Sequence, residues 1–158
     1  MNSTPDAARR SAPDAPALKL WVVLARAHAA VQRHAEADAT RHGLTLTEFG
    51  ILEVLYHRGP LLLGEVQRRI LVSSGGVTYL IDRLERKGLV ERRDCPEDRR
   101  ARYAALTPAG EQLMREHFGE HAACIERALA ALDAEEQRQA TELLRRLGRH
   151  AAELEPGC

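Results

Sequence analysis

The stretch that decides the fold, residues 73–110, reads SSGGVTYLIDRLERKGLVERRDCPEDRRARYAALTPAG. Its first part carries four apolar residues at helical spacing, namely Val77, Leu80, Ile81 and Leu84. This pattern predicts a helix with one apolar face, and Gly88 stands where a left-handed residue commonly ends a helix. Two short strand-like segments then flank a charged turn. Thr107 and Pro108 predict the start of a second helix.

Upstream of this stretch the chain is predicted to form three helices and one short strand. The first helix spans residues 16–41, where leucine, valine and alanine recur at helical spacing. Thr45 and Glu48 have the spacing of a capping box, so a second helix is expected to begin there. A very short strand is expected over residues 61–63, followed by a short helix over residues 64–70.

Downstream of the hairpin two longer helices are predicted. The first runs from Pro108 to about Leu132, and Asp133 with Glu136 caps the second. The second helix carries one apolar stripe, formed by Ala140, Leu143, Leu144, Leu147, Ala151 and Leu154. The fold class is therefore mostly α, with about six helices and a small antiparallel β-wing. A short helix, a turn, a helix and a hairpin in this order predict a winged helix-turn-helix.

Composition indicates a single globular domain over residues 16–158, since 44% of the chain is hydrophobic and its net charge is zero. Residues 1–15 are rich in proline and small or polar residues and are expected to form a disordered tail. Charge is unevenly distributed. Residues 61–105 hold ten basic against seven acidic residues, whereas residues 106–158 hold six against ten. This distribution favours the approach of a polyanion to the middle of the chain.

The three cysteines have no paired spacing, so no disulfide framework is predicted. The chain shows no apolar signal core, and no apolar run approaches the 18 or so residues of a membrane span. We expect a cytoplasmic protein with no membrane partner and no cofactor.

The segments DRLERKGLVERR, EDRR and ALTPAG are similar to the signature of the MarR family of bacterial winged helix-turn-helix transcription regulators. The element order agrees with that family over about residues 20–150. The resemblance implies a winged helix-turn-helix over about 46–106 and dimerisation helices over about 16–42 and 107–155. It also implies a homodimer, in which Leu143, Leu147, Leu154 and the segment Leu18 to Trp21 suit the interface. The expected function is repression at a pseudo-palindromic operator in double-stranded DNA, with half-sites about 34 Å apart.

The expected DNA contacts lie around the start of the helix that precedes the hairpin. Small residues there let backbone amides approach phosphate, and polar side chains can reach base edges. The residues are Ser73, Ser74, Gly75, Gly76, Thr78, Tyr79 and Arg83. Arg83 and its neighbour Arg86 are expected to meet phosphate. The alternative is a solvated amphipathic helix, which the adjoining hairpin disfavours.

The turn of the hairpin supplies the second set of expected contacts: Asp98, Arg99 and Arg100. An arginine at such a tip can enter the narrow minor groove, where the negative potential is enhanced. The family's Asp-x-Arg pattern falls on Asp98 and Arg100. The resemblance therefore implies that Asp98 orients Arg100 while Arg99 meets the DNA backbone. Further basic surface is expected from Arg92, Arg93 and Arg102.

The resemblance also implies release from DNA by a small aromatic or phenolic effector, bound between the dimerisation helices and the DNA-reading part. Candidate ligand-binding residues are Trp21, His28, Phe49, Leu52, Tyr56 and His57. For each of them an ordinary core or boundary position is the alternative. The segment LVSSGGVTYLIDRLERKGLVER with CPEDRR is further similar to a subgroup that responds to quinones and hydroquinones.

Two other sensing modes stay open at the level of sequence. His117, His121 and Cys124 recur at i, i+4 and i+7, so one helix face presents three zinc-binding side chains. Zinc-sensing relatives need a further ligand on the second helix, where this chain offers Phe49, so the prediction is no metal site. The second mode is redox sensing by oxidation of Cys95. Neighbouring arginines favour the oxidisable thiolate form of this cysteine, but neighbouring acidic residues oppose it.

An enzyme and a protein–protein adaptor are the alternatives of a different class. The sequence has no phosphate-binding glycine loop, no HExxH and no GxSxG motif, so no enzymatic activity is predicted. A winged-helix adaptor stays possible, and salt-dependent binding to a DNA duplex distinguishes a regulator from an adaptor.

Overall fold

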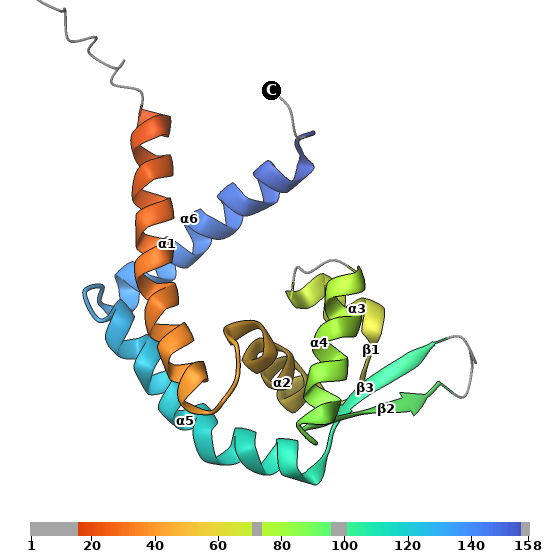
Figure 1. The fold of residues 1–158 in the computed structure, drawn as a ribbon. Helices are drawn as coiled ribbons and strands as arrows, with labels where there is room; N and C mark the ends of the chain where they lie inside the picture. The colour runs from red at the N-terminus through yellow and green to blue at the C-terminus, as the bar shows by residue number, and fades with distance from the viewer. Residues whose placement is uncertain (1–15, 71–73, 96–100, 156–158) are drawn as a thin grey trace, which may run out of the picture.

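The computed structural model describes residues 16–70, 74–95 and 101–155, in which six helices and a three-stranded sheet are formed (Figure 1). The helices are α1 (Pro16–Arg41), α2 (Leu46–Arg58), α3 (Leu63–Ile70), α4 (Ser74–Arg86), α5 (Pro108–Leu129) and α6 (Ala134–Glu153). The predicted class, mostly helical with a small antiparallel wing, is confirmed. Within the described ranges no helix is long and apolar enough to cross a membrane.

The sheet consists of β1 (Leu61–Leu62), β2 (Val90–Asp94) and β3 (Arg102–Leu106). The strand order is β1-β3-β2 and both pairings are antiparallel. In the β2–β3 hairpin Val90 pairs with Leu106 at the base and Asp94 with Arg102 toward the tip. Residues 96–100, which connect these two strands, lie outside the described residues.

The elements divide into a compact body and an extended part. In Figure 1, α2, α3, α4 and the sheet lie together, whereas the N-terminal half of α1 and the whole of α6 reach away from them. α5 connects the two regions and packs against both α1 and α2. The hairpin projects from the compact body at the side opposite to α1. This arrangement leaves both α4 and the wing accessible at one end of the molecule.

One hydrophobic core joins the helices to the sheet. Its fully buried side chains include Phe49, Ile51, Leu52, Leu55, Val66, Ile81, Leu84 and Met114. The predicted core face of α4 is confirmed, because Val77, Ile81 and Leu84 are buried and Leu80 packs against the same cluster. Burial of one aliphatic side chain contributes roughly 1.5–3 kcal/mol, so these residues fix how α4 sits on the body.

The predicted helix ends are formed as the sequence indicated. Thr45 accepts a hydrogen bond from the Glu48 amide, and the Glu48 carboxylate accepts one from the Thr45 amide. Asp133 and Glu136 form the equivalent capping box of α6. Gly88 has φ of 72°, the left-handed conformation in which glycine is favoured.

One prediction about the longer helices is corrected by the structure. α5 ends at Leu129 rather than at about Leu132. The backbone bonds from Ala130 to Arg127 and from Leu132 to Leu129 form tighter turns there, which lead into the Asp133 cap. In the N-terminal half of α1 the apolar stripe lies on the surface of the single chain, since Leu20 and Val23 are exposed and burial begins near Ala35.

Candidate nucleic-acid interface and adjoining sites

α4 lies beside the hairpin (Figure 1), and one of its faces is exposed to solvent. Thr78 and Tyr79 are exposed on this face, and Gly76 is half-buried. The Arg83 guanidinium lies 5.7 Å from the centroid of the Tyr79 ring. The helix begins at Ser74, one residue after Ser73. Thr78 and Tyr79, two residues expected to contact DNA, therefore lie on an accessible helical surface.

A buried carboxylate fixes α4 to α2. Glu48 is fully buried, and its Oε2 accepts a 2.9 Å hydrogen bond from Lys87 Nζ. Arg83 Nε lies 3.1 Å from Glu48 Oε1 as an ion pair that is not aligned as a hydrogen bond. Burial by itself raises the pKa of Glu48, but bonds from the Thr45 amide and Lys87 and the two cations outweigh it, so the pKa is lowered.

Lys87 and Arg83 therefore have a structural role that the sequence did not reveal. Lys87 Nζ also donates a 2.7 Å hydrogen bond to the carbonyl of Gly43, in the turn between α1 and α2. Arg83, expected to meet phosphate, is only 32% exposed and turns toward Glu48. Its spacing on α4 indicated an outward face, whereas a partner 35 residues away in the chain draws it inward.

One arginine of β2, Arg92, is paired with acidic side chains of α4. Arg92 forms ion pairs with Asp82, at 2.7 Å, and with Glu85 of α4. The Arg92 amide donates a further 2.9 Å bond to Glu85. These contacts hold β2 at a fixed position relative to α4, so the helix and the hairpin form one unit.

Toward the tip of the hairpin, Arg93 pairs with Glu91 at 2.8 Å and Arg102 with Asp94 at 3.0 Å. These exposed pairs reduce the positive charge that the sequence predicted for this part of the surface. The remaining expected wing contacts, Asp98, Arg99 and Arg100, lie outside the described residues, as does Ser73. Cys95, at the end of β2, is buried, which limits the access of an oxidant to its thiol.

The six candidate ligand-binding residues do not line one cavity in the described part of the chain. Phe49 and Leu52 are fully buried in the core. Trp21 and His28 are exposed on α1. His57 is exposed at the end of α2, where its ring lies 4.8 Å from that of Phe118.

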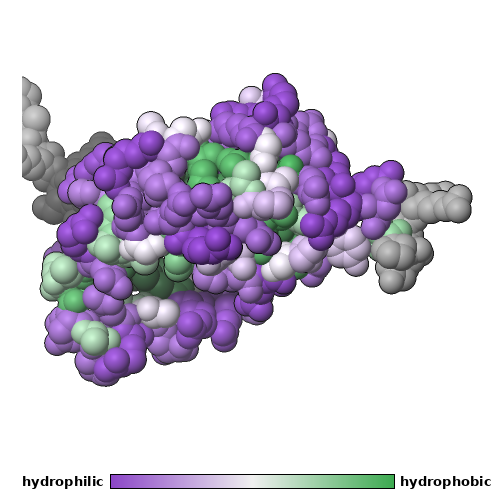
Figure 2. Space-filling model, turned by 90° about the horizontal axis from the view of Figure 1, so that it is seen from below, coloured by the Kyte–Doolittle hydropathy of each residue, from purple (hydrophilic) through white to green (hydrophobic). Residues whose placement is uncertain are grey.

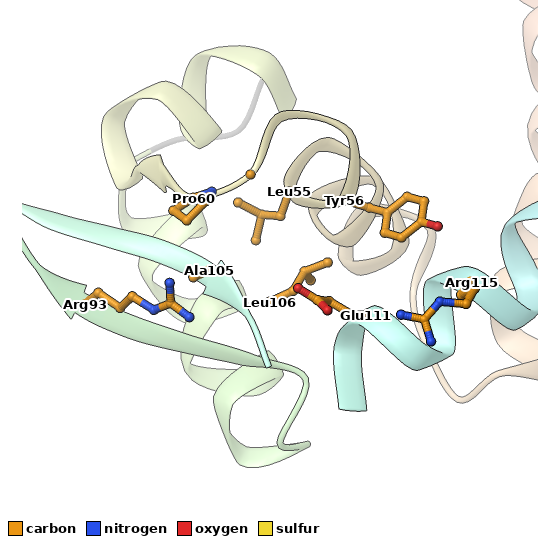
Figure 3. Close-up of a pocket in the computed structure, with 9 residues that line it drawn as sticks. Leu55, Tyr56, Pro60, Arg93, Ala105, Leu106, Glu111 and Arg115 are labelled. Carbon is orange, nitrogen blue, oxygen red and sulfur yellow. The ribbon is translucent and has the colours of Figure 1, made fainter. Parts of the chain in front are cut away.

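Tyr56 is the candidate ligand residue that borders a cavity. This cavity of about 200 Å³ lies between the end of α2, the sheet and the start of α5 (Figure 3). Its lining consists of Leu55, Tyr56, Gly59, Pro60, Arg93, Ala105, Leu106, Glu111 and Arg115. It thus combines aliphatic walls, one aromatic ring and side chains of both charges. No sequence pattern predicted this cavity, because three separate segments of the chain meet there.

The predicted zinc-type face of α5 is split among different partners. His121 is buried, its Nδ1 donates a 2.8 Å hydrogen bond to Asp38 of α1, and its ring packs on Phe49. Cys124 Sγ lies 3.7 Å from the carbonyl of His34. Asp38 was missed at the level of sequence, although a polar residue within the apolar stripe of α1 was a signal for it. Because His121 and Cys124 have these other partners, they do not form one metal site with His117.

An exposed apolar surface lies on α1, on α6 and at the residue that follows α6. Its large exposed side chains are Leu18, Leu20, Trp21, Val22, Val23, Leu143, Leu144, Leu147 and Leu154. Leu20 and three α6 leucines line a groove together with Arg146 and His150. By contrast, the lower face of the molecule is mainly hydrophilic and shows only small hydrophobic patches (Figure 2). Concentration of apolar groups on two helices is typical of a protein interface.

The chain is similar to bacterial transcription regulators over most of its length. A model described as the MarR family matches residues 42–101. The transcriptional regulator MhqR of Bacillus subtilis is 41% identical over 134 residues, which cover 85% of this chain and 92% of that protein. YkoM, an uncharacterised regulator from the same organism, is 42% identical over 138 residues, covering 87% and 90%.

Solved structures give the same result for the fold. Sco3205, a MarR family regulator from Streptomyces coelicolor solved in complex with DNA, superimposes with a TM-score of 0.81 at 25% identity. The superposition covers 87% of this chain and 92% of Sco3205.

Proposed function

Because the chain belongs to the MarR family of transcription regulators, we propose that it is a homodimeric repressor that binds a pseudo-palindromic operator and leaves it when a small phenolic molecule binds. The observation that carries the DNA-binding part is the unit formed by α4 and the hairpin. The buried Glu48 of α2 pairs with Lys87 at the end of α4, and Arg92 of the hairpin pairs with Asp82 on the surface of α4. A rigid pair of this kind can present a helix to the major groove and a wing to the minor groove.

For the helix, we propose contacts at its leading end and exposed face. The residues are Ser73, Ser74, Gly75, Gly76, Thr78 and Tyr79, with Arg86 near phosphate. In this proposal Tyr79 and Thr78 touch base edges or thymine methyl groups. Arg83 acts mainly by holding α4 on α2, because its guanidinium turns toward the buried Glu48.

For the wing, we propose that Arg100 enters the minor groove, that Asp98 orients it, and that Arg99 meets the DNA backbone. The ion pairs of Arg92, Arg93 and Arg102 support this assignment indirectly, since they leave these three guanidinium groups less available for DNA. The assignment itself rests on the family pattern.

Mobility-shift titration at fixed salt tests the wing. Arg100→Ala is expected to weaken binding to a selected operator at least about tenfold, since one base-edge or groove contact is worth about 1–3 kcal/mol. Arg93→Ala, a matched change on the same hairpin, is expected to have a much smaller effect. Equal affinity of the Arg100 variant and the unchanged protein would remove the wing from the proposal.

The effector is proposed to occupy the cavity beside Tyr56. An apolar cavity of about 150 Å³ is known to hold benzene, so a cavity of about 200 Å³ suits a single substituted ring. Arg115 can bind a phenolate, Arg93, which is paired with Glu91, adds positive charge to the lining, and Glu111 can accept a hydrogen bond from a hydroxyl group. A phenol, hydroquinone or quinone is the ligand class that combines one ring with these groups.

Calorimetric titration with hydroquinone tests this part separately from DNA binding. Arg115→Met is expected to abolish or strongly weaken the heat of binding, because it removes one of the two cations. Arg127→Met, at the far end of α5, is expected to bind as the unchanged protein does. If the two variants behave alike, or if the unchanged protein binds nothing, the cavity is not the effector site.

A further inference from the structure

Two imidazoles and a carboxylate converge where the α1–α2 turn meets α5. His42 lies in that turn, and His117 and Glu120 lie one helical turn apart on α5. One ligand atom from each lies within 4.8 Å of the other two, and in the described part of the chain this is the group of metal-ligating side chains that meets such a limit. The rings of His42 and His117 are 4.0 Å apart between centroids and tilted by 32°.

Two of these nitrogens are buried and have no hydrogen-bond partner. They are Nε2 of His42 and Nδ1 of His117. A buried polar atom without a partner costs on the order of 1–3 kcal/mol, and such atoms are uncommon in folded proteins. Stacking of the two rings accounts for their contact but not for the unpaired nitrogens. A cation that both nitrogens coordinate satisfies the two atoms at once.

The third side chain completes a donor set suited to zinc. Glu120 Oε2 lies 3.9 Å from His117 Nδ1, the unpaired nitrogen. Two imidazoles and one carboxylate, with an open fourth position, form a common zinc arrangement with bonds of about 2.0–2.2 Å. Ligand atoms around such an ion lie about 3.3 Å apart, so the side chains must move inward by an ångström or so. Glu120 is 62% exposed and can swing freely.

The surrounding charges are compatible with a bound cation. Glu116 Oε2 lies 4.0 Å from Nε2 of His117, the ring nitrogen that would remain free, and an outer carboxylate at that position orients a metal-binding histidine. Arg41 is the nearby cation that interacts with Glu120, but its guanidinium is hydrogen-bonded to Asp38. The positive charge of Arg41 repels a bound cation, but its pairing with Asp38 weakens this repulsion.

We propose that His42, His117 and Glu120 form a binding site for a divalent transition metal of the zinc type. This ligand set differs from His117, His121 and Cys124, the three zinc-binding side chains that the spacing on α5 indicated. Only His117 belongs to both sets. The ion bridges α5 and the α1–α2 turn. His42 precedes Gly43, whose carbonyl accepts the hydrogen bond from Lys87, the residue that follows α4. The site is thus one residue away from a contact that positions α4.

Competition with a chromophoric zinc chelator tests the site on the metal-free, full-length protein. One zinc per protomer is expected. His42→Gln and Glu120→Gln are each expected to lower the affinity at least about tenfold, because changes even outside the ligand set typically cost 10–100-fold. His150→Gln, an exposed histidine on α6, serves as the matched control and is expected to bind as the unchanged protein does.

Cobalt(II) loading distinguishes this ligand set from one that uses Cys124. No thiolate charge-transfer band is expected, and Cys124→Ser is expected to leave the affinity unchanged. Because Glu120 is exposed, Glu120→Gln keeps the test valid even if His42→Gln disturbs folding. The proposal is overturned if the unchanged protein binds no stoichiometric zinc, or if Glu120→Gln binds as tightly as His150→Gln. Neither measurement involves DNA, so the outcome is independent of the repressor function.

Discussion

Two buried acids flank the junction between α1 and α2. Asp38 is 1% exposed and Glu48 is fully buried. Asp38 is hydrogen-bonded to His121 and Arg41, and Glu48 to Lys87 and the Thr45 amide. Each carboxylate therefore connects the junction to a distant element, Asp38 to α5 and Glu48 to α4. Buried charges are tolerated when they are paired in this way, and losing one partner is costly.

Asp38→Asn is expected to destabilise the protein by about 1–3 kcal/mol near pH 7. Burial raises the pKa of Asp38, but bonds and charges from Arg41 and His121 outweigh it, so the folded-state pKa is lowered. The stabilisation is therefore present above the unfolded-state pKa of about 3.9 and is lost as the pH falls through the folded value.

Urea unfolding of both proteins at pH 7 and below pH 4 measures this difference. The gap between the unchanged protein and the variant is expected to shrink as the pH falls below the unfolded-state pKa toward the lower folded-state pKa, because Asp38 of the unfolded chain then binds a proton more readily than Asp38 of the folded protein. A gap that stays constant or widens on acidification contradicts this assignment of the ionised pair.

At this scale the sequence predicts what is local and misses what is distant. The capping box of Thr45 and Glu48 spans three residues, so its spacing alone revealed it. The pair between Asp38 and His121 joins residues 83 positions apart, and the chain's path between them is a tertiary property. The contact between His42 and His117 was missed for the same reason. The periodic pattern on α5 grouped His117 with His121 and Cys124 instead.

At the scale of elements, the joint between the hairpin and α5 depends on one glycine. A Cβ atom at Gly110 would lie 2.1 Å from the carbonyl oxygen of Leu89. That carbonyl accepts a hydrogen bond from the Thr107 amide, and the Thr107 hydroxyl donates a 2.6 Å bond to the Gly88 carbonyl. The first turn of α5 thus packs directly on the start of the hairpin.

Gly110→Ala is expected to destabilise the protein by roughly 1–3 kcal/mol, because the methyl group forces the turn and the hairpin apart. Gly119→Ala in the same helix meets nothing within 4 Å and is expected to be neutral or to stabilise by up to about 1 kcal/mol. Chemical denaturation of both variants gives the comparison. Similar stabilities for the two would refute the proposed close packing at Gly110.

Helices were predicted correctly where the apolar periodicity agreed with residues that begin or end a helix. The apolar stripe of α4, the break at Gly88 and the cap at Thr107 each indicated the observed structure. The stripe of α1 was equally periodic, yet its N-terminal half is exposed in the single chain. Periodicity reports that a helix has an apolar face, but not whether the same chain or a second copy covers it.

At the scale of the whole molecule, that uncovered face supports the proposed dimer. Eight large apolar side chains on α1 and α6, together with Leu154 directly after α6, are exposed in the described structure, and burying them contributes about 25 cal/mol per Å². A second copy that covers the same face also sets the distance between two α4 helices. Dimerisation and operator spacing are therefore linked.

Leu147→Asp combined with Leu143→Asp is expected to convert the dimer into a monomer, because each charge must otherwise be buried in an apolar interface. Light scattering after gel filtration is expected to change from twice the chain mass of 17.6 kDa to that mass. Arg145→Asp, on the opposite side of α6, is the control and should remain dimeric. A dimer that persists with both leucines replaced excludes this surface as the interface.

The measurement that most directly tests the central claim is selection of bound DNA fragments by the purified full-length protein, followed by titration of the selected site. One enriched pseudo-palindrome with half-sites about one helical turn apart is expected. Binding to this site is expected to be at least about 10³-fold tighter than binding to a scrambled duplex at the same salt concentration. No enriched sequence, or equal affinity for the selected and the scrambled duplex, would contradict the claim that this protein reads DNA.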